Sequence, residues 1–87
     1  MSEDRLELTL RLLRRKVKEN VLPISADERV SEVVAAGLLL LHPDTLRRLR
    51  GEGSGPMHFK IGVGGSKVSY RLIDLAIWLE GRREISA

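Results

Sequence analysis

Basic side chains gather between His42 and Arg71, and they are the residues in this chain best suited to binding chemistry. That stretch carries six bases against two acids, Asp44 and Glu52, whereas residues 23–41 carry three acids and one base. A guanidinium group can form two parallel hydrogen bonds to a phosphate or a base edge, and an ammonium group acts as a point charge. The pattern indicates a polyanion-binding surface, although a merely solvated basic face would look the same. The six bases are Arg47, Arg48, Arg50, Lys60, Lys67 and Arg71.

Other site chemistries find no support in the sequence. The chain has no cysteine, so it can form neither a disulfide nor a thiolate zinc site. The stretch GVGGSK lacks the order of a phosphate-binding loop, and His42 and His58 have no partners at metal-ligand spacing. We therefore expect no cofactor, no metal and no enzymatic activity.

The size and composition are those of one small globular domain. The chain has 87 residues, of which 43% are hydrophobic and 31% charged, and it is too short for a deep catalytic cleft. Charges interrupt the leucines of its N-terminal stretch, which excludes a signal peptide or a membrane span there. We expect a cytoplasmic protein without membrane contact.

The first 22 residues predict an amphipathic helix. Leu6, Leu10, Leu13 and Val17 recur at helical spacing between positions 3 and 20, and Pro23 ends the pattern. Alternating leucines at positions 6 to 12 also fit a strand, but the long run of good helix formers favours a helix. Its leucines either complete the core or pair with a second copy, and the core is favoured because a small domain needs the buried area. Residues 22–29 are expected to be a connector.

Two short helices with a tight turn follow. Ser31 is a plausible N-cap for a helix over Glu32 to about Leu39, and Pro43 suits the first position of a helix that runs to Arg50. Two helices joined in this way form a helix-turn-helix, whose second helix enters the major groove of DNA.

The stretch FKIGVGGSKVSY predicts a β-hairpin. A tight turn at Gly64 and Gly65 would place four large apolar residues on one face. The expected pairs are Val63 with Ser66, Ile61 with Val68, and Phe59 with Tyr70, which leaves Lys60, Lys67 and Ser69 on the other face. Such a hairpin is typical of the wing of a winged helix-turn-helix. A closing helix follows, with Leu72, Leu75, Trp78 and Leu79 on one stripe.

The residues from Val30 to Arg83 resemble the MerR-like winged helix-turn-helix of the excisionase and AlpA type. The resemblance rests on VSEVVAAGLLLLHPDTLRRLR and on FKIGVGGSKVSYRLIDLAIWLEGRR. The chain departs from the family pattern at Leu40, where glycine is usual, and at His42 and Ile73, where serine is usual. Leu40 must therefore adopt either a left-handed conformation or another turn geometry.

The resemblance implies a mostly helical α+β fold, with residues 23–87 as a winged helix-turn-helix domain with a two-stranded wing. Residues 1–22, which the resemblance does not cover, are expected to add an N-terminal helix. It also implies sequence-specific binding of double-stranded DNA, as a small transcription regulator or an excisionase-like recombination directionality factor. A homodimer or tandem copies, and a recombinase, are the expected partners. The alternative is a protein-interaction module, an anti-repressor or adaptor that has this fold without DNA binding.

The expected contacts fall into two groups. Residues of the second helix would reach base edges, since arginine bonds guanine bidentately; they are Asp44, Thr45, Arg47 and Arg48. Residues of the wing and its surroundings would contact the DNA backbone or the minor groove; they are Arg50, Lys60, Ser66, Lys67, Ser69 and Arg71.

Overall fold

A computed structural model of the chain describes residues 3–84. This part forms α1 (Glu3–Glu19), β1 (Arg29–Ser31), α2 (Glu32–Leu38), α3 (Pro43–Glu52), β2 (Phe59–Ile61), a short 3₁₀ turn η1 (Val63–Gly65), β3 (Lys67–Arg71) and α4 (Leu72–Gly81). The strands form one antiparallel sheet in the order β1-β3-β2. The predicted class, α+β and mostly helical, is confirmed at this level.

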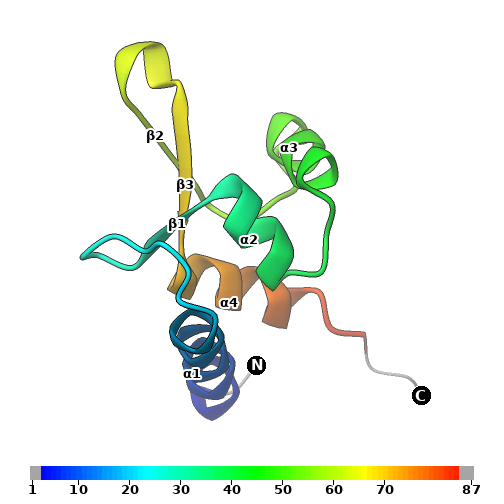
Figure 1. The fold of residues 1–87 in the computed structure, drawn as a ribbon. Coiled ribbons are helices and arrows are strands. Elements are labelled where there is room, and N and C mark those ends of the chain that lie inside the picture. The colour runs from blue at the N-terminus through cyan, green and yellow to red at the C-terminus, as the bar shows by residue number, and fades with distance from the viewer. Residues whose placement is uncertain (1–2, 85–87) are drawn as a thin grey trace.

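The elements divide the molecule into a base and two projections. α4 packs along α1 and against β3, while α2 contacts α3 and strands β1 and β3. In Figure 1, α1 and α4 lie at the lower end, and α3 and the β2–β3 hairpin both project from the upper end. Two separate elements of the chain are thus presented on one side of the molecule.

α1 is a helix, as its leucine spacing predicts, rather than a strand. Leu10, Leu13 and Val17 are at most 7% exposed, whereas Leu8 and Leu12 remain about half exposed. Three turns of α1 therefore contribute to the same core as the rest of the chain. That core, aliphatic except for one tyrosine, consists of Leu10, Leu13, Val17, Val30, Ala35, Ala36, Leu39, Leu46, Tyr70, Leu72, Leu75 and Ala76.

The prediction of a connector through Arg29 missed strand β1. Arg29–Ser31 pair with β3, and Val30, 1% exposed, lies opposite the fully buried Tyr70. A three-residue strand is too short to show the alternation that identifies strands. Its partner lies about 40 positions along the chain, so no local signal marks it.

Both helices around the predicted turn form where their caps predict. The Ser31 hydroxyl accepts a hydrogen bond from the Val34 N–H at 3.2 Å. α2 ends at Leu38, and the Leu41 N–H then donates to the Ala36 carbonyl at 2.8 Å, which closes the turn. Of the two geometries open to Leu40, the left-handed one is present, with φ of 59°. α3 continues two residues beyond the predicted end, to Glu52.

The predicted hairpin register is wrong by one residue. Three glycines of residues 62–66 have positive φ, and two successive turns form there, closed by Gly65 N–H to Gly62 carbonyl (3.1 Å) and Ser66 N–H to Val63 carbonyl (3.2 Å). The connection is therefore longer than the two-residue turn expected from Gly64 and Gly65. The observed pairs are Phe59 with Ser69, Lys60 with Val68, and Ile61 with Lys67.

This shift moves side chains between the faces of the sheet, since a slip of one residue reverses the facing of every side chain. Lys60 lies on the core side beside Val68, and Ile61 is 47% exposed on the outer side. The expectation of one apolar and one basic face is wrong. The outer face instead carries Phe59, Ile61, Lys67, Ser69 and Arg71.

α4 forms as predicted and links the base to the upper part of the molecule. Leu72 and Leu75 are fully buried, while Trp78 and Leu79 pack against the core at its edge. The Trp78 indole N–H donates to the Ser54 carbonyl at 2.9 Å, in the segment between α3 and β2. α4 thereby restrains the segment that leads to the hairpin.

Candidate nucleic-acid interface

α3 is fixed by its own sequence at both ends. Pro43 occupies the first turn, and His42 caps it because its Nδ1 accepts a hydrogen bond from the Asp44 N–H at 3.1 Å. Gly53 ends α3 in a left-handed conformation, with φ of 73°. Since Leu46 is fully buried, the opposite side of α3 faces away from the core.

The outward side of α3 carries four of the charged residues of the chain. Arg47 and Arg48, expected to reach base edges, are 65% and 61% exposed, and Asp44 is 67% exposed. Arg47 donates to Asp44 at 2.6 Å, and Arg48 donates to Glu52 at 2.8 Å. Thr45 is half-buried on the flank. The helix thus presents two arginines, each bonded to an acid of the same helix.

These two ion pairs hold the arginines only weakly. Exposed pairs between helix positions i and i+3 or i+4 contribute about 0.3–0.5 kcal/mol each. A guanidinium can therefore leave its acid for a stronger acceptor at small cost. The paired acids, however, cancel the formal charge of this side of α3.

Arg50, assigned by sequence to phosphate contact, faces the body of the molecule instead. Its Nε and Nη2 donate to the two carboxylate oxygens of Glu32 at 2.7 and 3.1 Å, and the Tyr70 hydroxyl donates to the same carboxylate at 2.6 Å. Arg50 and Glu32 are only 17% and 18% exposed. The cluster joins α2, α3 and β3, so Arg50 holds α3 in place. The sequence could have predicted this inward direction, because Arg50 follows the buried Leu46 by four positions and so lies only about 40° from it around the helix.

The pKa values follow from these contacts. The Arg50 hydrogen bond lowers the pKa of Glu32, with help from the Tyr70 hydroxyl and against the opposing effect of burial. Burial, and then the bond to Glu32, raises the pKa of Tyr70. The Glu32 bond raises the pKa of Arg50. The cluster thus holds an ionised pair and a protonated tyrosine at neutral pH.

The hairpin carries two lysines with no competing acid. Lys60 and Lys67 are exposed, and neither forms an ion pair with any residue of the described part of the chain. They lie on opposite faces of the hairpin, as the observed register requires. Ser66, also assigned to DNA contact, is exposed at the tip. The hairpin therefore offers a cation on each face.

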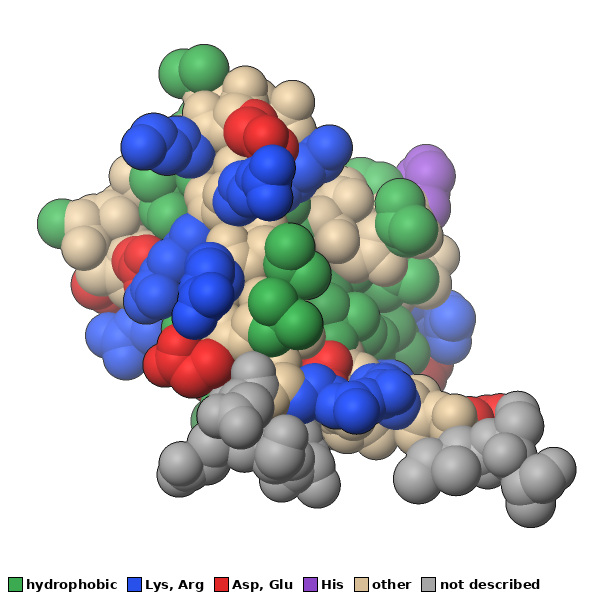
Figure 2. Space-filling view, turned by 90° about the horizontal axis from the view of Figure 1, so that it is seen from below, with side chains coloured by type: hydrophobic (Ala, Val, Ile, Leu, Met, Phe, Trp, Pro, Cys, Tyr) green, Lys and Arg blue, Asp and Glu red, His purple; other side chains and the backbone are tan. Residues whose placement is uncertain are grey.

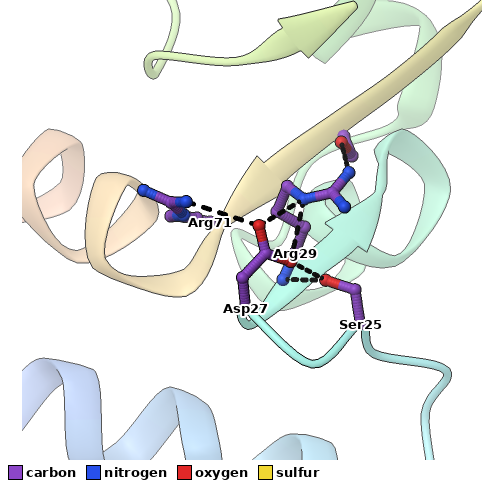
Figure 3. A network of polar contacts seen from close by, with 5 residues as sticks. Ser25, Asp27, Arg29 and Arg71 are labelled. Carbon is purple, nitrogen blue, oxygen red and sulfur yellow. Dashed lines mark hydrogen bonds and ion pairs between the residues drawn. The ribbon is translucent and has the colours of Figure 1, made fainter. Parts of the chain in front are cut away.

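Two arginines cover an aromatic ring on the outer face of the sheet. The guanidinium carbons of Arg29 and Arg71 lie 5.6 and 5.0 Å from the centre of the Phe59 ring, within the range of cation–π attraction. Asp27 lies between the two guanidinium groups, bonded to Arg29 at 2.8 Å and to Arg71 at 3.3 Å, as Figure 3 shows. The two cations share one acid, which leaves a formal charge of +1.

The same network includes Ser25 and Ser69. The Ser69 hydroxyl, assigned to DNA contact, accepts a hydrogen bond from Arg29 at 3.1 Å. The bond from Arg29 and a further one from Ser25 hold the pKa of Asp27 well below its usual range. Sequence reasoning missed Arg29 and Asp27, because they meet Arg71 only through the pairing of β1 with β3.

The expected site residues thus form two groups on elements that project from the same end of the molecule (Figure 1). One group is Asp44, Thr45, Arg47 and Arg48 on α3; the other is Lys60, Ser66, Lys67, Ser69 and Arg71 on the hairpin. Arg50 belongs to neither group. Within the described residues, no cluster of histidine, cysteine, aspartate or glutamate could hold a metal ion.

Comparison of the chain with protein-family models, with curated proteins and with solved structures finds no match. Of the helices that the structure describes, none combines the length and the apolar character that crossing a membrane requires.

Proposed function

We propose that the protein binds double-stranded DNA sequence-specifically through a winged helix-turn-helix. α2 and α3 are the helix pair, α3 enters the major groove, and the β2–β3 hairpin is the wing on the backbone or in the minor groove. The role is that of a small transcription regulator or a recombination directionality factor, both of which use these contacts. The basic side chains of α3 other than Arg50, and the lysines of the hairpin, are exposed, as binding to another molecule requires, and we propose no catalytic role for them.

One observation carries the proposal: α3 and the hairpin, each with exposed basic side chains, project from the same end of the molecule (Figure 1). α3 has ten residues, which corresponds to about 15 Å of helix. An α-helix is about 10–12 Å in diameter with its side chains, which fits a major groove about 12 Å wide. The hairpin beside it can follow the adjacent backbone.

The residues divide by what they can recognise. Arg47 and Arg48 have the exposure and geometry for bidentate bonds to guanine, and Thr45 can contact a phosphate or a thymine methyl group. Lys60 and Lys67, on opposite faces of the hairpin, suit phosphates on the two sides of a groove. Arg50 contributes indirectly, since its bond to Glu32 positions α3.

Selection of bound sequences from a pool of random duplexes tests the proposal. We expect a defined site, and we expect Arg48→Ala to weaken binding to that site by about tenfold or more relative to random DNA. Arg11→Ala is the matched control, because Arg11 is exposed on α1, away from α3 and the hairpin. It removes the same charge and should leave the preference unchanged. Equal losses on cognate and random DNA would refute a base-reading role for Arg48.

The wing is tested by the salt dependence of affinity. Each phosphate contact adds about one unit to the slope of log affinity against log salt. Lys67→Ala should therefore reduce the slope by about one, on cognate and random duplexes alike, whereas Arg11→Ala should leave it unchanged. An unaltered slope in Lys67→Ala would remove the hairpin from the interface.

A second function has one observation in its favour: Asp44 and Glu52 cancel the charge of Arg47 and Arg48 on α3. That balance suits a protein-interaction module, such as an anti-repressor or adaptor. The two functions differ at low salt, where a DNA-binding protein is retained on bulk duplex DNA and released steeply as salt rises. Failure to bind any duplex at low salt would overturn the DNA proposal in favour of this one.

A further inference from the structure

An apolar groove of about 830 Å³ runs between α1, α2, the turn after α2, and α4. Three of its lining residues are large and exposed: Leu12 is 53%, Val33 67% and Leu40 94% exposed. In Figure 2, hydrophobic side chains gather across the middle of the face seen from below, with Lys and Arg side chains and some Asp and Glu side chains around them. Adjoining exposed apolar side chains of this kind mark interaction sites on small proteins.

Leu40 is an exposed apolar residue of the groove that the packing of the fold does not explain. Its φ of 59° is left-handed, a conformation that costs a side chain free energy and that glycine adopts freely. The turn itself is closed by backbone groups, through the bond from Leu41 N–H to the Ala36 carbonyl. The leucine side chain is almost fully in solvent, so packing does not account for it. A strained and exposed apolar residue that also lines a groove points to a contact outside the folded chain.

The charged side chains that line the groove indicate which kind of partner it would bind. α1 contributes Arg15, Lys16 and Glu19 to the lining, a formal charge of +1, whereas the lining residues of α2 are uncharged. Arg15 is paired with Glu19 at 3.4 Å, and Lys16 forms no ion pair within the described part of the chain. A second copy would bring its own basic α1 against these cations. An acidic helix would be attracted to them.

We propose that this groove binds an amphipathic helix of a partner protein, one with leucine-like side chains on one face and acidic side chains beside them. The apolar face would cover Leu12, Val33 and Leu40, and the acidic side chains would meet Lys16. Recognition of a helix in a groove relies on apolar residues at positions i, i+3, i+4 and i+7, which suits a groove bounded by helices.

The inference is independent of the proposed DNA binding. None of the lining residues belongs to α3 or to the hairpin, so a helix in the groove would leave the exposed arginines of α3 free. Loss of one activity can therefore be separated from loss of the other. For a DNA-binding protein, the groove would be the surface that recruits a second protein to the site.

The test is selection from a displayed library of 16-residue helical peptides against the full chain. The library has leucines fixed at positions i, i+4, i+7 and i+11, and all other positions are randomised over charged and polar residues. We expect the selected peptides to be enriched in Asp and Glu. Leu40→Gly should weaken the best peptide by about tenfold or more, the loss expected when one leucine contact is removed, and Lys16→Glu should also weaken it.

Val21→Gly is the matched control. Val21 is likewise exposed (87%) and left-handed (φ of 50°), but it does not line the groove. Both glycine variants should unfold at or above the wild-type urea midpoint, and only Leu40→Gly should lose the peptide. Selection of no binder or of basic peptides, or equal binding by Leu40→Gly, would overturn the proposal. If the wild-type chain sediments as a dimer and Leu40→Gly sediments as a monomer, the proposal is overturned in favour of a second copy as the occupant.

Discussion

Replacing Arg50 by methionine tests how α3 is held against the body of the molecule. The change keeps an unbranched side chain of similar length but removes the two hydrogen bonds to Glu32, at 2.7 and 3.1 Å. The Glu32 carboxylate, 18% exposed, would keep only the Tyr70 hydroxyl as a partner. A charge that is mostly buried would lose its counter-ion.

The magnitude follows from the burial of the pair. Removing one partner of a fully buried ion pair costs about 3–5 kcal/mol, and a hydrogen bond to a charged group contributes about 1.5–3 kcal/mol. Residual exposure and the remaining Tyr70 bond reduce the penalty, so we expect a loss of about 2 kcal/mol at pH 7. In a domain of this size that loss corresponds to a melting temperature lower by roughly 10 °C.

The penalty should also depend on pH. Because Arg50 lowers the pKa of Glu32 in the folded state, the pair stabilises the protein above the unfolded pKa of about 4.3. That stabilisation is lost as pH falls through the folded pKa. The difference in stability between wild type and Arg50→Met should therefore be largest at neutral pH and should shrink toward pH 3. Other acids with lowered pKa, such as Asp27 and Glu28, affect both proteins alike and cancel in the difference.

Urea unfolding, followed by circular dichroism at pH 7, 5 and 3, measures these differences. Adding Glu32→Gln to Arg50→Met should recover part of the loss, because the amide does not bury a charge, and the double-mutant cycle isolates the pair. The reasoning would be refuted by a penalty under about 0.5 kcal/mol at pH 7, or by a penalty that stays constant down to pH 3.

Two further predictions concern the same part of the molecule. Tyr70→Phe removes only the hydroxyl that donates to Glu32 and should cost about 1 kcal/mol in urea unfolding; a loss equal to that of Arg50→Met would contradict the assignment of Arg50 as the main partner of Glu32. Asp27→Asn removes the acid shared by Arg29 and Arg71, and if the outer sheet face contacts DNA it should raise duplex affinity at low salt, measured by fluorescence anisotropy; unchanged or weaker binding would contradict that contact.

The helices could be predicted because their signals are local. Ser31 marks the start of α2 through a bond to a residue three positions on, and Pro43 marks the start of α3 through its fixed φ. The leucine spacing of α1 fixes its buried side within one helix. The outward direction of Arg48, and the position of Arg47 on the flank, follow from the position of Leu46 by helical geometry alone. Such features need no knowledge of the rest of the chain.

The sheet could not be predicted to the same accuracy because its pairing is not local. Two adjacent glycines, Gly64 and Gly65, fit a two-residue turn as well as the longer connection that includes Gly62. The choice between them shifts the register by one residue and so reverses the facing of Phe59. Strand β1 has only three residues, too few to show the alternation that identifies a strand. The network of Arg29, Asp27 and Arg71 depends on the pairing of β1 with β3, so the sequence carries no local sign of it.

The distribution of charge suggests how the two projections would share the work of DNA binding. Each exposed arginine of α3 already has an acid partner, so α3 would attract a distant duplex little. The long-range attraction would then come from Lys60 and Lys67 and from the outer sheet face. At contact the balance changes, because an intrahelical pair that contributes only about 0.3–0.5 kcal/mol yields to a bidentate bond with guanine, which discriminates by about 1–3 kcal/mol. The released carboxylates would then disfavour any register that places them against phosphate. If the proposed DNA binding holds, the hairpin would supply affinity and α3 would supply selectivity. Substitutions in the hairpin should then weaken all duplexes equally, and those in α3 should weaken the cognate site most.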